Sequence, residues 1–582
     1  GSVVCVRADE AYGDGAVAPG QHRLHAGPNA LDLPLSAEFV VADSGTAATG
    51  GRPGPRGAKA VAEANSLHAG HGAEHVRQLL ADEFPDALEK RVHERREGLP
   101  ELPNSEGGEL VFRFAPNPNG PLTLGHSRGV IINSEYARQH GGRIVLRFDD
   151  TGIKTKPPLA EAYGWIDDEF RWLTGSAPDV RLLASERMDL YLDKARDCLA
   201  QRICYVCTCT ADEFKVTRVA REACPCRTRS AEQNLTEWGR MLDGTHAEGD
   251  AVVRVLTDME ERNPALRDWP ALRIQTGEHP LVGTRYRVWP LLDFQSAIDD
   301  EDQGVTHIIR GKDLMDSTRK QTQLYDKLGW TYPETLYWGR VKVHEFGGFS
   351  TSQMRADIDA GDYSDWDDIR LPTIRALRRR GFTAESLRLF WLELGLTQKD
   401  ISVPMATLEA HNSSLVDAST PRLSLLRDPV RLVLDVSAVE MPSELVLPNH
   451  PTEDLGVRTW PLATDSGLEV LIEKGDLEVA LSGDGVLRLK EFADIEVTAD
   501  GGGRVLHFEK GDGVRIVHWL AAGVERDAVL LHDFEGELQH PCMLESNEHA
   551  EGTLVQLERV GFARIEQVGA EGRPWRLVWT HG

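Results

Sequence analysis

Residues 111–151 read VFRFAPNPNGPLTLGHSRGVIINSEYARQHGGRIVLRFDDT, and they decide the fold class. The apolar segment Val111–Ala115 predicts a buried strand, followed by a turn rich in Pro, Asn and Gly. A helix is predicted from Gly125 to His140, and the apolar segment Arg143–Phe148 predicts a second strand. Strand, turn, helix and strand in this order are typical of a parallel sheet, so we expect a doubly wound α/β domain.

The α/β pattern continues on both sides of one interruption. Helices are predicted near residues 158–173 and 186–201. After residue 285 the pattern predicts a helix at 291–298, a strand at 305–310 and a helix at 317–328. After residue 420, short β-branched runs at 430–436, 468–472, 486–489, 514–517 and 554–557 alternate with Gly and Asp turns. Such spacing predicts one or two antiparallel β-barrels.

The turn before the first helix has the properties of a nucleotide site. Gly125 lets a nucleotide approach the backbone, and the helix N-terminus favours phosphate oxygens. His126 follows directly and can donate a hydrogen bond to an oxyanion. A lone Gly-His pair is more often an ordinary helix start, but the complete string from Arg113 to Arg128 favours the nucleotide site.

Two arginines stand at the ends of predicted strands. Arg113 ends the first strand and Arg310 a later one, so both are expected at the crevice outside the carboxyl ends of the sheet. A guanidinium group offers a bidentate fork to a carboxylate, which predicts an acidic ligand. The alternative is that each arginine pairs with a structural aspartate such as Asp149 or Asp300.

Five of the eight cysteines lie between Cys204 and Cys226. Two cysteine pairs separated by fourteen residues can supply four thiolates to a tetrahedral zinc ion. A pairing of Cys204 with Cys207 is an alternative choice of ligands. Buried or reactive thiols without a metal are the other interpretation.

Four separated segments carry a resemblance to a known family: residues 113–128, the GGRIVLRFDDT segment at 141–151, YRVWP at 286–290 and VTHIIRGKD at 305–313. In this order they resemble the class I aminoacyl-tRNA synthetases of the glutamyl and glutaminyl group. Over about residues 108–582 the chain looks most like the archaeal-type glutamyl-tRNA synthetases. The resemblance implies a Rossmann-like catalytic domain, and ligation of L-glutamate to tRNA(Glu) through a glutamyl-adenylate.

The resemblance also implies the site residues and cofactors. ATP with Mg²⁺ is implied as a substrate, and catalytic roles fall on His126, Ser352 and Gln353. The implied ATP-binding residues belong to the two signature segments, and they are Pro116, Asn119, Gly120, Thr123, Gly125, His126, Ser350, Thr351 and Ser352. The implied glutamate contacts are Arg113, Asn117, Ser296 and Arg310.

Two positions depart from the family pattern. Thr123 stands where the first signature has its first His. The second signature, usually Lys-Met-Ser-Lys-Ser, corresponds to Phe349–Met354, with Gln353 where the family often has Lys. A neutral Gln cannot screen the charge on a triphosphate, and Arg355 or Lys342 are candidates to replace it.

For tRNA, the resemblance implies phosphate contacts on one Arg-rich helix in the helical segments at 373–395. The residues are Arg375, Arg378, Arg379 and Arg380, and a solvated face is the alternative. The implied ligands of a structural Zn²⁺ are Cys207, Cys209, Cys224 and Cys226.

The sequence thus divides into six predicted segments. Residues 1–107 are an N-terminal appendage, partly helical, with an amphipathic helix at Leu79–Arg96. Two halves of the catalytic domain follow at 108–201 and 286–345, separated at 202–285 by an acceptor-end-binding insertion with a zinc knuckle. Residues 346–418 carry the signature loop and a helical connector. Residues 419–582 are expected to be anticodon-binding β-barrels.

The net charge of −27 first argues against a polyanionic partner, because the basic footprint of a nucleic-acid binder is missing from the chain as a whole. The motifs overrule this argument. The 14 Lys and 51 Arg, beside 92 acidic residues, indicate either a salt-adapted surface or GC-rich codon usage. The apolar runs fall short of the roughly 20 residues of a membrane span, and no secretory signal is recognisable, so we expect a cytoplasmic monomer.

Two alternative functions remain at this stage. Glutaminyl-tRNA synthetase shares the scaffold, but Ala115 and the cysteine pairs favour the glutamyl branch. The departures at Thr123 and Gln353 allow a catalytically weakened tRNA-binding paralogue. Charging of tRNA(Gln) with glutamate is a further activity that the sequence leaves open.

Overall fold

The computed structural model describes residues 5–8, 20–27, 35–41, 98–346, 350–534 and 536–582. The chain forms two compact units, Gly1–Arg96 and Glu97–Gly582. The first unit contains an antiparallel sheet in the order β1-β2-β3, which the sequence analysis did not predict. Its strands are β1 (Cys5–Ala8), β2 (Gly20–Gly27) and β3 (Leu35–Val41). The predicted helix Leu79–Arg96 lies outside the described residues.

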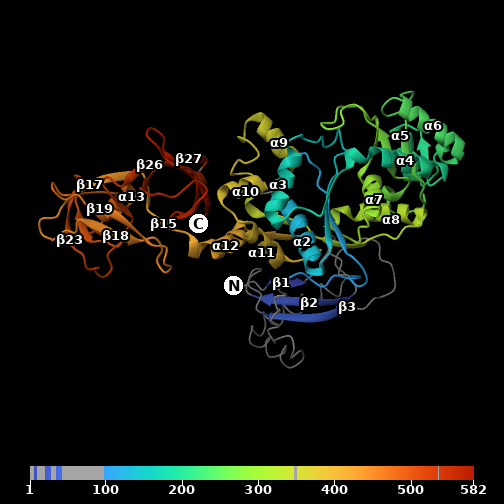
Figure 1. The fold of residues 1–582 in the computed structure, drawn as a ribbon. Helices are drawn as coiled ribbons and strands as arrows, with labels where there is room; N and C mark the ends of the chain where they lie inside the picture. Colours follow the sequence, from blue (N-terminus) through green and yellow to red (C-terminus); the bar gives the residue numbers. More distant parts are fainter. Residues whose placement is uncertain (1–4, 9–19, 28–34, 42–97, 347–349, 535) are drawn as a thin grey trace. The chain divides into compact units, whose positions relative to one another are not determined.

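The ribbon of the whole chain is drawn in Figure 1. A five-stranded parallel sheet organises the second unit, and its strand order is β12-β11-β4-β5-β6. The strands are β4 (Val111–Phe114), β5 (Arg143–Phe148), β6 (Val180–Leu183), β11 (His307–Gly311) and β12 (Glu334–Trp338). The order reverses between β4 and β11, and ligands bind at such a switch point in doubly wound sheets. The predicted doubly wound parallel sheet is confirmed.

Five helices accompany this sheet at the predicted places. They are α2 (Leu124–His140), α3 (Ala162–Thr174), α4 (Met188–Ala200), α7 (Leu292–Asp302) and α8 (Met315–Leu328). Val130 and Ile132 of α2 and Phe170 of α3 are fully buried in one apolar core with Phe112 and Leu146 of the sheet. Among the described helices, none has the length and apolar character needed to cross a bilayer.

The insertion is built on an antiparallel sheet in the order β10-β9-β8-β7. Its elements are β7 (Cys204–Cys207), α5 (Ala211–Ala220), α6 (Ala231–Asp243), β8 (Val252–Val255), β9 (Pro270–Ile274) and β10 (Val288–Pro290). Strand β10 follows the predicted boundary at residue 285, yet it completes this sheet. One apolar core joins the sheet to α4, α7 and α8.

The connector after the parallel sheet is helical, with one short parallel strand pair. It comprises β13 (Val341–Val343), α9 (Thr351–Ala360), α10 (Ile374–Arg380), α11 (Ala384–Leu394), β14 (Ile401–Val403) and α12 (Met405–Val416). Two backbone hydrogen bonds fasten α10 to the first signature: Leu124 N–H donates to Pro372 O and Ile374 N–H to Leu122 O, both at 2.8 Å.

The C-terminal part consists of two seven-stranded sheets and one hairpin. The first sheet contains β15 (Arg422–Leu423), β16 (Leu425–Arg427), β26 (Glu525–Phe534), β27 (Glu537–Glu545), β28 (Leu554–Leu557), β29 (Gly561–Gln567) and β30 (Trp575–His581). The second contains β17 (Pro429–Asp435), β20 (Leu468–Glu473), β21 (Val486–Leu489), β22 (Asp494–Val497), β23 (Gly502–His507), β24 (Ile516–Val517) and β25 (Trp519–Ala521). The hairpin is β18 (Glu444–Pro448) with β19 (Val457–Pro461), and α13 (Lys474–Leu481) follows β20.

The predicted purely antiparallel barrels need correction. The pairs β15–β28, β17–β23, β21–β24 and β26–β30 are parallel. Alternation of apolar residues reveals which face of a strand is buried but says nothing about the direction of its neighbour. The parallel pairs join strands distant in sequence, so turn signals could not reveal them either.

Candidate active site

The first signature ends in a reciprocal cap at the start of α2. Thr123 is the N-cap residue, and its Oγ1 accepts the His126 N–H at 3.3 Å. In return, the Thr123 N–H donates to Nδ1 of His126 at 3.2 Å. Because Nδ1 is the acceptor, the neutral imidazole carries its proton on Nε2. His126 is therefore prepared to act as a hydrogen-bond donor through Nε2.

The charge of His126 is set by its surroundings. Although the residue is exposed, desolvation by the surrounding protein and the charge of Lys156 lower its pKa to about 4. The ring is thus neutral at pH 7. Sequence reasoning missed Lys156. Its positive charge near His126 has the same sign as the lysine that the second signature usually carries.

The loop before α2 is fixed at several points to its neighbours. Asn117 Nδ2 donates to Asp149 O at 2.9 Å, and Asp149 N–H donates to Pro116 O at 2.9 Å. Oδ1 of Asn117 is buried and has no hydrogen-bond partner within the described ranges, so it is available to a substrate donor. Asn119 is buried, like the backbone around it.

Gly120 and Gly125 of the first signature differ in the space around them. A methyl group added at Gly120 would lie 2.5 Å from Thr351 Cγ2 and 2.9 Å from the Trp366 ring. The two predicted ATP-binding segments therefore come together at Gly120. A methyl group at Gly125 would meet only Thr123 Oγ1, at 3.7 Å, which leaves open space for a ligand.

The second signature forms the start of α9. Ser350 is its N-cap and accepts the Gln353 N–H at 3.1 Å, while Phe349 lies outside the described residues. Ser352 is exposed, and Gln353 is exposed with its Nε2 donating to Asp357 Oδ1 at 2.7 Å. The Gln353 side chain thus already has a partner on its own helix, which does not favour its predicted catalytic role.

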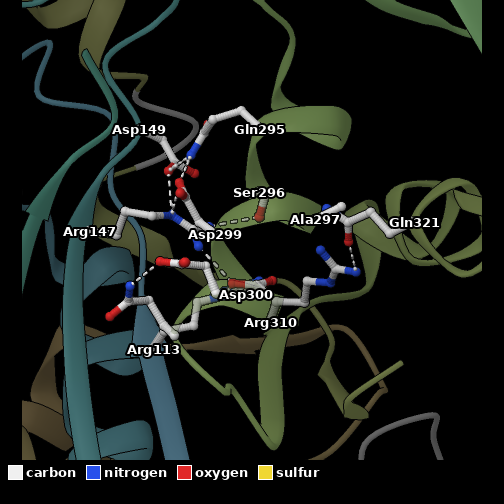
Figure 2. A network of polar contacts seen from close by, with 12 residues as sticks. Arg113, Arg147, Asp149, Gln295, Ser296, Ala297, Asp299, Asp300, Arg310 and Gln321 are labelled. Atoms are coloured by element: carbon white, nitrogen blue, oxygen red, sulfur yellow. Dashed lines mark hydrogen bonds and ion pairs between the residues drawn. The ribbon is translucent and has the colours of Figure 1, made fainter. Parts of the chain in front are cut away.

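Arg113 and Arg310 lie on β4 and β11, at the switch point of the sheet (Figure 2). Both side chains are buried, at 6% and 5% exposure. Arg113 Nε donates to Asp300 Oδ1 at 3.3 Å, so the alternative of a structural aspartate is realised there. Within the described residues, Arg310 Nη2 donates only to neutral groups: Thr318 Oγ1 at 2.5 Å, Gln321 Oε1 at 3.0 Å and Tyr332 OH at 2.8 Å.

Arg147 joins these side chains into one buried network (Figure 2). Its guanidinium group donates to Asp149 Oδ1 at 2.8 Å, to Asp300 Oδ1 at 2.6 Å and to Ser296 Oγ at 2.7 Å. Of the predicted glutamate contacts, the structure therefore brings Arg113 and Ser296 together through Arg147 and Asp300. Sequence reasoning named Asp300 only as a structural partner, because the central position of Asp300 and Arg147 depends on tertiary contacts.

The charged groups of this network shift one another's pKa values. Burial alone would raise the pKa of the Asp300 carboxyl, but the nearby Arg113 and Arg147 outweigh burial and lower it. Burial lowers the pKa of Arg113 against the attraction of Asp300. Asp300 Oδ2 and Arg310 Nε are buried and lack hydrogen-bond partners within the described ranges, so both can take a polar ligand.

Four cysteine sulfurs gather at the insertion sheet. The ligand atoms of Cys207, Cys209, Cys224 and Cys226 all lie within 4.8 Å of one another. The Sγ atoms of Cys207 and Cys224 are 3.8 Å apart, and those of Cys209 and Cys226 are 3.7 Å apart. A tetrahedral site with Zn–S bonds of 2.3 Å has sulfurs about 3.8 Å apart, so the geometry fits zinc.

The alternative pairing of Cys204 with Cys207 is wrong. Side chains alternate across a strand, so residues 204 and 207 of β7 face opposite sides. Cys204 packs into the core shared with α4, where its hydrogen bond with Cys198 raises its pKa. Cys207 packs with the other three cysteines.

The four arginines of α10 have different surroundings. Arg375 lies over the Trp165 ring at 4.9 Å, and Arg378 pairs with Asp168 at 2.6 Å. Arg379 pairs with Glu566 at 2.6 Å. Arg380 is a correction to the predicted phosphate contacts: it is only 8% exposed and donates to Thr580 O at 2.7 Å. Its guanidinium group packs the connector against β30 and does not reach the surface.

Comparison with known proteins agrees with this site. A model of the class I tRNA synthetase (E and Q) catalytic domain matches residues 109–417, more than half of the chain. The glutamate–tRNA ligase of Methanosarcina acetivorans is 44% identical over 502 residues, covering 84% of this chain and 86% of that protein. The glutamate–tRNA ligase of Archaeoglobus fulgidus is 42% identical over 518 residues, covering 88% and 90%.

Among solved structures, a glutamate tRNA ligase from Elizabethkingia meningosepticum aligns with a TM-score of 0.38 and 18% identity, covering 53% of this chain and 70% of that chain. The family match and the archaeal relatives extend over the parallel sheet, the insertion and the connector. The chain therefore belongs to the class I tRNA synthetases of the E and Q group, and within it to the family of the archaeal glutamate–tRNA ligases.

Proposed function

We propose that this protein ligates L-glutamate to tRNA(Glu) with ATP, through a glutamyl-adenylate. The observation that carries the proposal is the pair of buried guanidinium groups, Arg113 and Arg310, at the switch point of the parallel sheet. An amino acid with two carboxylates suits two such groups, because each guanidinium can bind a carboxylate in a bidentate manner. The archaeal relatives are named for the same ligation.

The first step forms the adenylate. The α-carboxylate of glutamate attacks the α-phosphate of ATP in line, the bond to the bridging oxygen breaks, and pyrophosphate leaves. The Nε2–H of His126 would donate to phosphate oxygens, and the Ser350–Ser352 segment would contact the triphosphate. Mg²⁺ bound to ATP would supply positive charge to the phosphates. The rate then depends on positioning and electrostatic stabilisation, since little covalent work falls on the protein.

In the second step a hydroxyl of the terminal adenosine of tRNA attacks the carbonyl carbon of the mixed anhydride, and AMP leaves. By family analogy the nucleophile is the 2′-OH. Asn117 Oδ1, which is buried and free of partners in the described part of the chain, supports a contact with the α-ammonium group of glutamate. Arg113 and Arg310 would hold the two carboxylates of glutamate in the first step, and the side-chain carboxylate that remains in the second.

The insertion would hold a structural Zn²⁺ with Cys207, Cys209, Cys224 and Cys226 as ligands. The sulfur separations of 3.7 and 3.8 Å support it, as does the burial of three of the four residues. Four clustered thiolates repel one another, and a divalent cation removes that repulsion. The metal would stabilise the turn structure beside β7, where the acceptor end of tRNA is expected.

The C-terminal sheets would read the anticodon of tRNA. A small cavity of about 70 Å³ is lined by Arg422, Arg458, Trp460, Lys490 and Glu558, among others. Trp460 is buried, and its Nε1 has no hydrogen-bond partner in the described ranges. Cations and indole rings gathered at one place are the kinds of group that bind the phosphates and splayed bases of single-stranded RNA, so we take this region as the candidate contact.

Pyrophosphate exchange tests the proposed enzyme. The full-length protein should exchange pyrophosphate into ATP with glutamate in the presence of tRNA, and should charge tRNA(Glu). Exchange with glutamine and not with glutamate would favour the glutaminyl alternative. No exchange above background with either amino acid would favour the weakened tRNA-binding paralogue. Charging of tRNA(Gln) beside tRNA(Glu) would extend the substrate range.

A further inference from the structure

A hollow of about 270 Å³ lies where α3, α10 and β29 meet. Four guanidinium groups line it: Arg375, Arg378 and Arg379 from α10, and Arg564 from β29. The sequence analysis singled out α10 but not Arg564, because Arg564 is more than 180 residues away in the chain. Four arginines at one place are exceptional in a chain with a net charge of −27.

The carboxylates in the hollow neutralise only part of this charge. Arg378 pairs with Asp168 at 2.6 Å, and Arg379 pairs with Glu566 at 2.6 Å and contacts Asp367 at 3.4 Å. Arg375 and Arg564 have no hydrogen-bonded or ion-paired side-chain partner within residues 98–346, 350–534 and 536–582. Two guanidinium groups thus face the hollow with their donors unused by the described protein.

The floor of the hollow contains a buried acid. Glu169 of α3 is only 2% exposed, and burial raises its pKa to about 8, so the carboxyl is protonated at pH 7. Oε2 accepts the Leu122 N–H at 2.7 Å. Oε1 is buried and has no partner in the described part of the chain. A protonated carboxyl that lines the hollow together with the arginines can donate to an anion.

The hollow is also connected to the first signature. Leu122, whose N–H is held by Glu169, immediately precedes the helix cap at Thr123. Thr123 in turn forms a β-bridge with Thr373, the residue before α10. The segment before α2 is therefore hydrogen-bonded to Glu169 and paired with the residue before α10.

We propose that this hollow binds one backbone phosphate of tRNA, with Arg375 and Arg564 supplying the guanidinium donors and the unpartnered Oε1 of Glu169 beside them. The phosphate would also bring Arg378 and Arg379 out of their present pairs. Occupancy would brace the loop of the first signature through the Glu169–Leu122 hydrogen bond. The inference rests on the proposed charging of tRNA and goes beyond it in naming the phosphate site and its link to the loop.

Equilibrium binding of tRNA(Glu) to the full-length protein tests the site. Arg564→Gln and, on the other element, Arg375→Gln should each raise Kd about fivefold to tenfold and reduce the salt slope of log Kd by about 1, as loss of one phosphate contact predicts. Arg196→Gln, at an exposed arginine of α4, is the matched control and should leave both quantities unchanged. Unchanged Kd and slope in both test variants, with melting temperatures like the wild type, would overturn the site.

Glu169 provides a second, independent readout. Glu169→Gln keeps a donor and an acceptor, so its Kd should equal that of the wild type at pH 7. At pH 9 the wild type should lose affinity several-fold more than this variant, because only Glu169 loses its proton. The charged groups that face it are Asp168, Arg375 and Arg378. The same pH dependence in both proteins would contradict the donor role of Glu169.

Inorganic phosphate distinguishes a tRNA site from a free-anion site. If phosphate raises the melting temperature of the wild type but not of Arg564→Gln, while tRNA affinity is equal in the two proteins, the hollow binds free phosphate only and the proposal is wrong. Failure of the ligation is recognised separately: a wild type that binds tRNA(Glu) but never attaches glutamate would disprove the enzyme and leave the Kd comparisons valid.

Discussion

At the scale of single residues, Gly120 stands where any side chain would collide with Thr351 and Trp366. We expect Gly120→Ala to push the first-signature loop away from α9, raising KM for ATP about tenfold and lowering the melting temperature. Overpacking of this kind typically costs about 1–3 kcal/mol. Pyrophosphate exchange at varied ATP concentrations and thermal unfolding measure the two effects.

Gly125→Ala is the matched control for this prediction. Its methyl group would meet only Thr123 Oγ1 at 3.7 Å, so the fold should keep its melting temperature. If ATP packs against Gly125, KM for ATP rises nonetheless. An unchanged KM would mean that Gly125 does not face the nucleotide.

His126 carries a second prediction at this scale. His126→Ala should lower the exchange rate by about 10²–10³-fold, as expected for removal of one preorganised donor to a charged transition state. The affinity of this variant for tRNA should hardly change, because His126 does not line the phosphate hollow. Equal losses of rate and tRNA affinity would indicate misfolding instead of a lost donor.

The lowered pKa of His126 also predicts how the exchange rate depends on pH. Because the pKa of His126 is lowered to about 4, protonation begins only as the pH falls toward 4, and the ring stays neutral from pH 6 upward. The exchange rate should therefore show no inflection near pH 6.5 that depends on this residue. An inflection at 6.5 that disappears in His126→Ala would contradict the neutral donor.

At the scale of elements, the cysteine cluster beside β7 allows a metal prediction. The intact protein should contain about one zinc ion per chain, and the Cys207→Ser/Cys209→Ser variant should contain none, because two of four thiolate ligands are lost. Cys204→Ser is the matched control, since Cys204 faces the other core and should keep the metal. Elemental analysis of the folded proteins decides between these outcomes.

The parallel sheet and its helices were predictable because their signals are local. The strand–turn–helix segment after Val111 and the helix that ends at His140 were placed within one or two residues of β4 and α2. The clustering of Cys207, Cys209, Cys224 and Cys226 was predictable for the same reason. The buried position of Arg380 was not predictable. Four neighbouring arginines look alike in the sequence, and only the structure shows that Arg380 donates to Thr580 O, 200 residues away.

The central position of Arg147 and the parallel strand pairs of the C-terminal sheets also escaped prediction. Arg147 owes its role to Asp300 and Ser296, which come from α7 on the other side of the insertion. Strand direction in a sheet depends on which distant strands pair, as β17 with β23 shows. In each case the missing information was a contact between residues far apart in the sequence.

At the scale of the whole molecule, the net charge of −27 permits a prediction that separates its two explanations. If the carboxylates are an adaptation to salt, KCl up to about 1 M should raise the melting temperature, because screening relieves repulsion among like charges. If codon usage alone explains the composition, salt should chiefly weaken the surface ion pairs and lower it. Thermal unfolding across a KCl series measures the sign.

The insertion sheet has a consequence for modularity. Strands β7 and β10, by which the chain enters and leaves, occupy opposite edges of the sheet, three strand spacings or about 14 Å apart. A shortcut that replaces the insertion must therefore span that width with at least four extended residues or so. Even then, the deletion would expose the faces of α4, α7 and α8 that share an apolar core with the insertion sheet. The insertion therefore cannot simply be deleted. A shortened ligase would need new residues on the faces of α4, α7 and α8 that the deletion exposes.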